Sequence, residues 1–323
     1  MSNSKAKPIS HYEGGGLPHR NDPTQPPLVV PVILNWNKEE LTLDTLASLR
    51  EQDYPRMQSI VVDNGSQNQQ EALAKIKRAF PEVQTYGIRP PNVGFTGGCN
   101  TGMRLALEAG ADYLFVINND ILLDPSAISE LITVLEADSS VGAASPLMYY
   151  ASEPDRIWFG GGKLLMGGRV LPEHGEENNI TPDSPPQEAD WLTGTAIMVR
   201  REAIEQARML DRRYFLYWED VDWTLALRKA GYRLLLVPSS VIWHRVSATM
   251  GEMPLSVLYY WERNRLYFIE RWGDWRSKMI AWGKIAWRLL AWRFKDPTAN
   301  PLVPVKLQAY TDYLLRRTGR KRE

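Results

Sequence analysis

Short, continuous apolar runs alternate with helical patterns in the first half of the chain, and this alternation limits the possible folds more than any other feature. The apolar runs lie at 28–34, 59–63 and 113–117, with a weaker one at 84–88. The helical patterns lie at 41–50, 71–80, 102–108 and 125–135. Runs without polar alternation are typical of strands buried on both faces, and strands that alternate with helices predict a largely parallel α/β sheet.

Proline and glycine mark the remaining boundaries. Pro31 lies inside the first apolar run and has no N–H to donate, so it predicts the start of that strand or an edge strand. Residues 1–27 contain five prolines and three consecutive glycines, which predicts a flexible tail. Further on, the sequence predicts hairpins and a long loop at 149–190, strands at 191–199, 232–237 and 241–243, helices from 201 and at 221–229, and helices beyond Pro254 with a break at 297–304.

The charge and cysteine content exclude several classes of protein. The chain has 323 residues with 38 basic and 38 acidic side chains, so it lacks the basic excess of a dedicated nucleic-acid binder. Cys99 is the only cysteine, which excludes an intramolecular disulfide and a cysteine-based zinc cluster. No apolar, charge-free stretch reaches the about 18 residues that a membrane-spanning helix needs. We therefore expect a globular protein with a sizeable core.

Polar side chains follow three of the predicted strands, at the edge where parallel α/β sheets bind ligands. These strand ends are Asn35-Trp36-Asn37, Asp63-Asn64-Gly65 and Asn118-Asn119-Asp120. A carboxylate such as Asp120 can bind a divalent cation at such an end, and the same tripeptide also fits a plain polar turn. His244 ends another apolar strand, where it fits either a structural role or a metal site shared with a carboxylate from elsewhere in the chain.

Three acids, Glu219, Asp220 and Asp222, lie between aromatic residues at the start of a predicted helix. Acids in a first helical turn complement the helix dipole, which is the structural interpretation. The functional interpretation is a general base, which must lie within hydrogen-bond reach of an acceptor hydroxyl. The flanking tyrosine and tryptophan rings fit a sugar-binding face or the edge of a core.

Taken in chain order, these segments resemble the family 2 glycosyltransferases of the GT-A fold, in particular bacterial rhamnosyltransferase-like members. The matching segments are 31–37, 61–66, 92–100, 118–120, 191–195, 219–222 and His244. The resemblance covers residues 28–250, where it implies a catalytic domain with a Rossmann-like mixed, mainly parallel sheet. We expect the 1–27 tail before this domain and a helical region at 251–323 after it.

The resemblance also implies roles for individual residues. It implies Mg²⁺ or Mn²⁺ as the cofactor, held by Asp120 and His244, and a catalytic base at Asp220 with Glu219 beside it. It implies that Asn37 and Asp63 hold the base and ribose, and that glycines in the 92–100 loop allow a close backbone approach. The residues implied to bind or support the nucleotide sugar are Asn35, Asn37, Asp63, Asn92, Gly94, Asn100, Asn119, Thr193 and Gly194.

Residues 271–295 combine basic and aromatic side chains, with seven Lys or Arg, one acid and five Trp. On a helix, one polar stripe would leave a wide apolar face, as in an interfacial helix on an anionic bilayer. The stripe consists of Ser277, Lys284, Arg288 and Lys295. A helix packed on the catalytic domain and an oligomer interface fit the same pattern. We expect a cytoplasmic protein that associates with the inner face of the plasma membrane.

Together these features predict a metal-dependent, inverting glycosyltransferase. It would move a sugar, for example rhamnose, from a UDP-, dTDP- or GDP-linked donor to a polysaccharide or lipid-linked glycan. A nucleotidyltransferase on a similar sheet is the alternative enzyme, and it is disfavoured because the first strand lacks a glycine-rich phosphate loop. The alternative outside enzymes is a non-catalytic nucleotide-sugar or glycan-binding protein, which the combination of Asp120, Asp220 and His244 disfavours.

Overall fold

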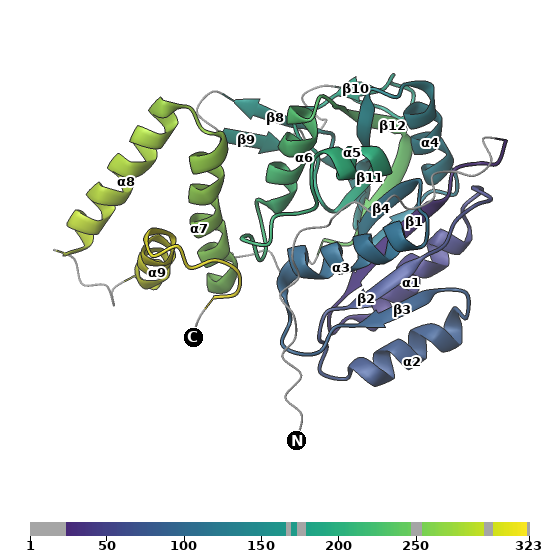
Figure 1. Cartoon of the computed structure of the whole chain (residues 1–323), viewed down its shortest axis with the longest axis horizontal. Coiled ribbons are helices and arrows are strands. Elements are labelled where there is room, and N and C mark those ends of the chain that lie inside the picture. The colour runs from purple at the N-terminus through teal and green to yellow at the C-terminus, as the bar shows by residue number, and fades with distance from the viewer. Residues whose placement is uncertain (1–23, 166–168, 173–178, 247–253, 294–299, 322–323) are drawn as a thin grey trace.

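The computed structural model describes residues 24–165, 169–172, 179–246, 254–293 and 300–321 (Figure 1). Residues 1–23 of the expected tail and Lys295 of the expected polar stripe lie outside this part of the chain. The strands are β1 Val29–Asn35, β2 Ile60–Asp63, β3 Gln84–Gly87, β4 Tyr113–Asn118, β5 Ile121–Leu123, β6 Val141–Tyr150, β7 Glu153–Phe159, β8 Gly162–Leu165, β9 Arg169–Pro172, β10 Gln187–Glu188, β11 Ala196–Arg200 and β12 Arg233–His244. The helices are α1 Glu39–Arg50, α2 Gln69–Ala79, α3 Gly94–Glu108, α4 Ala127–Ala137, α5 Arg201–Gln206, α6 Glu219–Lys229, α7 Leu255–Trp272, α8 Trp275–Arg293 and α9 Leu302–Leu314.

Ten of the described strands form one sheet, in the order β10-β12-β6-β11-β4-β1-β2-β3, with β5 added on β12 and β7 on β6. Strands β1 to β4 are parallel, and β6 is parallel to β12. Strand β11 runs antiparallel between β4 and β6. Helices cover both faces of the sheet (Figure 1). The α/β sheet of mixed direction that the sequence predicts is therefore confirmed.

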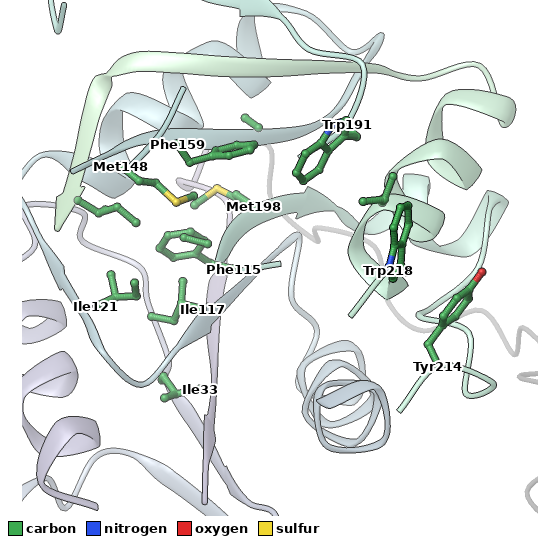
Figure 2. Packing of buried hydrophobic residues seen from close by; sticks show 14 of the residues in the cluster. Ile33, Phe115, Ile117, Ile121, Met148, Phe159, Trp191, Met198, Tyr214 and Trp218 are labelled. Carbon is green, nitrogen blue, oxygen red and sulfur yellow. The ribbon is translucent and has the colours of Figure 1, made fainter. Parts of the chain in front are cut away.

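The central strands are buried on both faces because successive side chains of a strand point to opposite sides. Val29 and Ile33 of β1 enter the core that contains α1, α2 and α4, whereas Val30 enters the core that contains α3, α5 and α6. Figure 2 shows Met148 of β6 and Met198 of β11 packed together in the first of these cores. This burial on both faces explains the continuous apolar runs in the sequence.

The expectation for Pro31 is wrong, because β1 is a central strand between β2 and β4 and Pro31 pairs with Phe115 in its interior. The Val29 N–H donates to the Arg56 carbonyl, and the Val29 carbonyl accepts from the Gln58 N–H. Both partners belong to the segment that leads into β2. Alternate residues of a parallel strand bond to the same side, so the Pro31 nitrogen also faces β2. The β1–β2 ladder starts only one residue later, at Val32, and the missing N–H therefore breaks no ladder bond.

Helix α3 begins at Gly94, eight residues before the predicted start at 102. Its first turns are rich in glycine, a poor helix former, and its N-cap residue, Val93, makes no side-chain capping hydrogen bond. The small residues are needed for packing instead. A Cβ added to Gly98 would lie 2.3 Å from Leu34 Cδ1, and one added to Gly102 would lie 2.2 Å from Val32 Cγ1. Tertiary packing on β1 and β2 therefore overrides the local propensity.

Three other boundaries also differ from the prediction. Strand β11 begins at Ala196, since Trp191 forms only an isolated bridge with Gly162 and the chain then turns at 194–195. Strand β12 runs unbroken from Arg233 to His244, because a bulge near Pro238 absorbs the proline that suggested two strands. Helix α9 begins at Leu302, inside the predicted break, since a proline such as Pro304 is tolerated in a first helical turn.

The three C-terminal helices lie together at one side of the sheet domain, with α8 farthest from the sheet (Figure 1). Helices α7 and α9 are joined by a hydrogen bond of 2.7 Å from the Tyr259 hydroxyl to Asp312 Oδ2. In the described part of the chain, no helix is both long and apolar enough to cross a lipid bilayer.

Candidate active site

The predicted polar residues at three strand ends meet in one hydrogen-bond network. Asn35 at the end of β1 is fully buried, and its Nδ2 donates to Asp63 Oδ2 at the end of β2, at 2.7 Å. The Thr42 hydroxyl donates to Asn35 Oδ1 at 2.9 Å and receives a hydrogen bond of 3.1 Å from Asn119 Nδ2. Asn119 follows β4, so this network fixes the edge of the sheet where β1, β2 and β4 end.

Asp63 organises the turn after β2 from a fully buried position. Besides the Asn35 amide, its carboxylate accepts from the Ser66 N–H and hydroxyl at 2.9 and 2.7 Å, and from Gln69 Nε2 at 2.8 Å. The Ser66 hydroxyl in turn accepts from the Asn37 N–H at 2.8 Å. Asn37 itself is exposed. Asp63 therefore shapes the loop that carries Asn37, and the predicted contact of Asp63 with a ligand stays a prediction.

A second network joins this edge to the start of α3. Asn64 Nδ2 donates to Asn92 Oδ1 at 3.2 Å and to the Gly94 carbonyl at 2.9 Å, and Asn92 Oδ1 accepts from the Gly94 N–H at 2.7 Å. Asn100, predicted to support the same loop, lies two turns further along α3. Its Nδ2 donates to the Leu210 carbonyl at 2.8 Å, and its Oδ1 accepts from the Leu210 N–H at 3.1 Å. Asn100 therefore fastens α3 to the segment before α6.

The glycine at the start of α3 allows a close approach, but to the protein's own backbone. Gly94 has φ of +83°, and an added Cβ would lie 2.5 Å from the Phe215 carbonyl oxygen. The next residue, Phe95, donates its N–H to that same oxygen at 2.8 Å. Gly94 is therefore required for the contact between α3 and the segment at 214–218, which leads into α6.

Gly94→Ala is expected to lower the free energy of unfolding by about 2–5 kcal/mol. A left-handed backbone costs alanine about 1–2 kcal/mol, and the forced contact with Phe215 adds about 1–3 kcal/mol. Gly110→Ala is the matched control, because Gly110 has φ of +84° and nothing within 4 Å of an added Cβ. Urea unfolding of both variants measures the difference. Equal losses would mean that Phe215 moves aside freely and that the close approach is not required.

Asp120 and His244, the two predicted metal ligands, lie side by side. Strand β12 pairs with β5 so that His244 lies opposite Ile121, and His244 Nε2 is 3.3 Å from Asp120 Oδ1. The Trp158 ring meets the His244 ring edge-on at 4.4 Å between centroids. Among the described residues, His244 Nδ1 is buried without a hydrogen-bond partner, and the buried Asp120 Oδ1 makes no hydrogen bond apart from this contact with His244 Nε2. A buried imidazole nitrogen without a partner is costly unless a ligand satisfies it.

These residues fit a divalent cation that is held partly by its substrate. In the part of the chain that the structure describes, no three His, Cys, Asp or Glu residues form a complete metal site. Mg²⁺ and related cations are commonly bound by one or two side chains, with water and substrate phosphates completing the shell. Asp120 would supply one such carboxylate, with the His244 imidazole beside it.

The predicted base lies against the 193–195 turn. Gly194 donates its N–H to Asp220 Oδ2 at 3.1 Å, and the Val221 N–H donates to Asp220 Oδ1 at 2.8 Å. Thr195 accepts a hydrogen bond of 2.9 Å from the Asn118 N–H, so this turn links Asp220 to the end of β4. Burial raises the pKa of Asp220, and the hydrogen bonds from Gly194 and Val221 partly oppose that rise.

The two neighbouring acids differ from Asp220 in their surroundings. Burial, followed by the nearby Asp220 carboxylate, raises the pKa of Glu219 well above its ordinary value. Asp222 is fully buried and receives hydrogen bonds from Arg208 at 2.6 Å, Arg271 at 3.0 Å and the Trp272 indole N–H at 2.7 Å. Asp222 thus fastens α6 to the end of α7. Asp220, which is partly exposed, is the acid best placed to meet a substrate.

The backbone before α6 is strained, and α7 holds it. Tyr217 and Trp218 have φ of +67° and +74°, a region that bulky residues rarely adopt and that costs about 1–3 kcal/mol each. Asn264 Nδ2, fully buried on α7, donates to the Leu216 and Tyr217 carbonyls at 2.8 and 3.1 Å. Phe268 of α7 packs on the Trp218 ring at 5.0 Å between centroids. The C-terminal helices therefore set the position of Glu219 and Asp220.

Sequence reasoning missed Asn264, although one signal for it exists. Asn264 is polar on a helical stripe that is otherwise aromatic, with Tyr260 four residues before it and Phe268 four residues after it. Such a residue is usually buried with a specific partner. The sequence gives no means of naming that partner, which lies 47 and 48 residues away in the chain.

Comparison with known proteins identifies the family. A family model described as "Glycosyl transferase family 2" matches residues 31–207. The N-acetylglucosaminyl-diphospho-decaprenol L-rhamnosyltransferase of Mycobacterium tuberculosis is 27% identical over 244 residues, covering 69% of this chain and 78% of that protein. The galactofuranosyltransferase GlfT1 of Mycolicibacterium smegmatis is 26% identical over 214 residues, covering 64% and 68% of the two chains.

Solved structures show the same fold. GalNAc-T7 with UDP, GalNAc and Mn²⁺ superposes with a TM-score of 0.64 at 16% identity, over 90% of this chain and 56% of that one. The mannosyltransferase PcManGT of Pyrobaculum calidifontis, in complex with GDP-Man and Mn²⁺, superposes with a TM-score of 0.54 at 17% identity, over 92% and 89%. Since the family model spans more than half of the chain, this protein belongs to glycosyltransferase family 2 and is a hexosyltransferase-type enzyme with the GT-A fold.

Proposed function

We propose that this enzyme is an inverting, metal-dependent glycosyltransferase that moves a sugar from a nucleotide donor to a lipid-linked or polysaccharide acceptor. The observation that carries the proposal is the pair of polar centres at one sheet edge. Asp120 and His244 lie 3.3 Å apart with His244 Nδ1 free of a hydrogen-bond partner, and Asp220 presents a carboxylate held by the backbone of Gly194 and Val221. The 193–195 turn joins the two centres through Asn118.

The donor is proposed to lie along the carboxyl ends of β1, β2 and β4. Asn37 and the loop organised by Asp63 would receive the nucleoside, and Asn92 would hold the adjoining turn before Gly94. Asp120 and His244 would hold a Mg²⁺ or Mn²⁺ ion beside the diphosphate. When bound, such an ion neutralises the charge that develops on the leaving diphosphate.

The reaction proposed for Asp220 is a single displacement. Its carboxylate accepts the proton of the acceptor hydroxyl while that oxygen bonds to the anomeric carbon of the donor sugar. The bond from this carbon to the diphosphate breaks on the opposite side, and its electron pair leaves with the nucleoside diphosphate. The anomeric configuration is therefore inverted. The raised pKa of Asp220 supports this role, because a base is more effective as its pKa approaches the working pH.

The remaining proposals concern substrates and location. The two mycobacterial relatives are named as a rhamnosyltransferase acting on a decaprenol-linked acceptor and as a galactofuranosyltransferase, which supports a lipid-linked acceptor and a deoxyhexose or hexose donor. We place the reaction at the cytoplasmic face of the plasma membrane, where such an acceptor would be presented.

A transfer assay tests the proposed function. The enzyme is incubated with Mn²⁺, a polyprenyl-diphosphate-linked sugar and UDP-, dTDP- or GDP-sugars in turn, and release of the nucleoside diphosphate is measured. We expect release from one donor class, dependent on the acceptor. Tight donor binding with no release from any donor and acceptor pair would favour a nucleotide-sugar-binding protein instead.

A further inference from the structure

Helix α8 has apolar side chains on its outward side as well as on its inner side, where Ile285 is buried and Leu289 and Trp292 pack against the core. Its outward face, as we call it, consists of exposed residues spaced at helical intervals: Trp275, Met279, Ile280, Trp282, Trp287 and Leu290. Trp275 and Trp287 are each 70% exposed. A helix on the surface of a globular domain normally buries its apolar stripe. An exposed apolar patch of this kind marks an interaction site.

Part of the predicted polar stripe faces α7 and α9. Ser277 is buried, and its N–H donates to Asp274 Oδ1 at 2.7 Å, so that Asp274 caps the start of α8. Arg288 hydrogen-bonds the Tyr310 hydroxyl of α9, and its Nη1 lies 3.7 Å from Glu262 Oε2 of α7. These polar contacts fix the rotation of α8 about its axis. The outward orientation of the exposed apolar residues is therefore specified by the fold.

The charges on α8 indicate what covers this face. From Trp275 to Arg293 the helix contains five Lys or Arg and no Asp or Glu. Arg276 and Lys284 are exposed between the apolar side chains, and the Arg276 guanidinium lies 5.3 Å from the centre of the Trp275 ring. Tryptophan with interspersed basic residues suits the interface of a bilayer, where the rings enter the headgroup region and the cations meet anionic lipids.

We propose that the outward face of α8 docks in the plane of an anionic lipid bilayer. A second copy of the chain is a poorer occupant, because a two-fold contact would place α8 opposite α8, and this basic helix contains no acid between Trp275 and Arg293. This docking surface stands independently of the proposed reaction, since no residue of the candidate active site belongs to it.

Vesicle flotation of the full chain tests the proposal. We expect the protein to float with vesicles of equal parts phosphatidylglycerol and phosphatidylcholine, and much less with phosphatidylcholine alone. The Trp275→Gln/Trp287→Gln double variant is expected to weaken partitioning about tenfold or more, since it removes aromatic surface that the bilayer would bury. Arg276→Gln/Lys284→Gln is expected to weaken it about tenfold at low salt, and high salt should release wild type only in part.

Two controls make the result decisive. Tyr86→Gln removes an exposed aromatic ring on β3, away from α8, and should float like wild type. Nucleoside diphosphate binding is also measured on every variant without vesicles. This measurement shows, independently of membrane docking, whether the fold and the candidate active site are intact. Failure of wild type to float, or equal flotation of wild type and the tryptophan double variant, overturns the proposal. A dimer that the tryptophan variant dissociates, with no flotation of either protein, assigns the face to a second copy.

Discussion

Asp220→Asn is expected to lower kcat by about 10²–10⁴-fold, the usual effect of removing a positioned general base. The dissociation constant of the nucleoside diphosphate should stay within about twofold, because a group that acts only on the acceptor proton contributes to the transition state and not to donor binding. An amide can keep the hydrogen bond from the Gly194 N–H but cannot take up the acceptor proton. Steady-state kinetics and calorimetry on the same preparations measure the two effects.

Glu219→Gln is the matched comparison for this prediction. The raised pKa of Glu219 favours its protonated form, which glutamine resembles in size and polarity. We therefore expect a much smaller loss of kcat than for Asp220→Asn. If Glu219→Gln loses turnover and Asp220→Asn keeps it, Glu219 is the base and the assignment to Asp220 is wrong.

Removal of divalent metal is expected to abolish most turnover and to weaken nucleoside diphosphate binding. In EDTA, kcat should fall by at least about a hundredfold, because a bound cation contributes several kcal/mol to stabilising the transition-state charge. The dissociation constant should rise about tenfold or more, since contacts with charged groups contribute about 1.5–3 kcal/mol. Calorimetric titration with UDP, dTDP and GDP, each with Mn²⁺ or with EDTA, measures the binding effect.

Variants of the two proposed ligands localise this effect. Asp120→Asn and His244→Ala should each require a higher Mn²⁺ concentration for binding and turnover. Asp44→Asn is the matched control, because Asp44 is an exposed acid that pairs with Arg245, the neighbour of His244. Unchanged affinity in EDTA, or an equal loss in Asp44→Asn and Asp120→Asn, would contradict a metal site at Asp120 and His244.

Much of the fold could be predicted because local sequence and tertiary structure agree along the central strands. The runs around Val30, Val61 and Phe115 are apolar since both faces of these strands are covered. Prediction failed where packing overrode propensity. The glycines of α3 argue against a helix locally, yet Gly98 and Gly102 are the residues that fit against Leu34 and Val32.

In the candidate active site, the pairing of Asp120 with His244 could be predicted, whereas the support of Asp220 could not. Asp120 and His244 follow strands, so the sheet brings them together once its strand order is given, and the resemblance named both. The support for Asp220 was not predictable, because it comes from Asn264 on α7 and from two left-handed residues, Tyr217 and Trp218. No local pattern signals that a C-terminal helix holds the backbone before α6.

The anomeric configuration of the reaction product tests the central claim most directly. The sugar product of the transfer assay would be analysed by proton and carbon NMR, and its anomeric centre compared with that of the donor. A single displacement with Asp220 as base predicts a linkage of the opposite configuration. A product that retains the configuration of the donor would contradict the proposed mechanism.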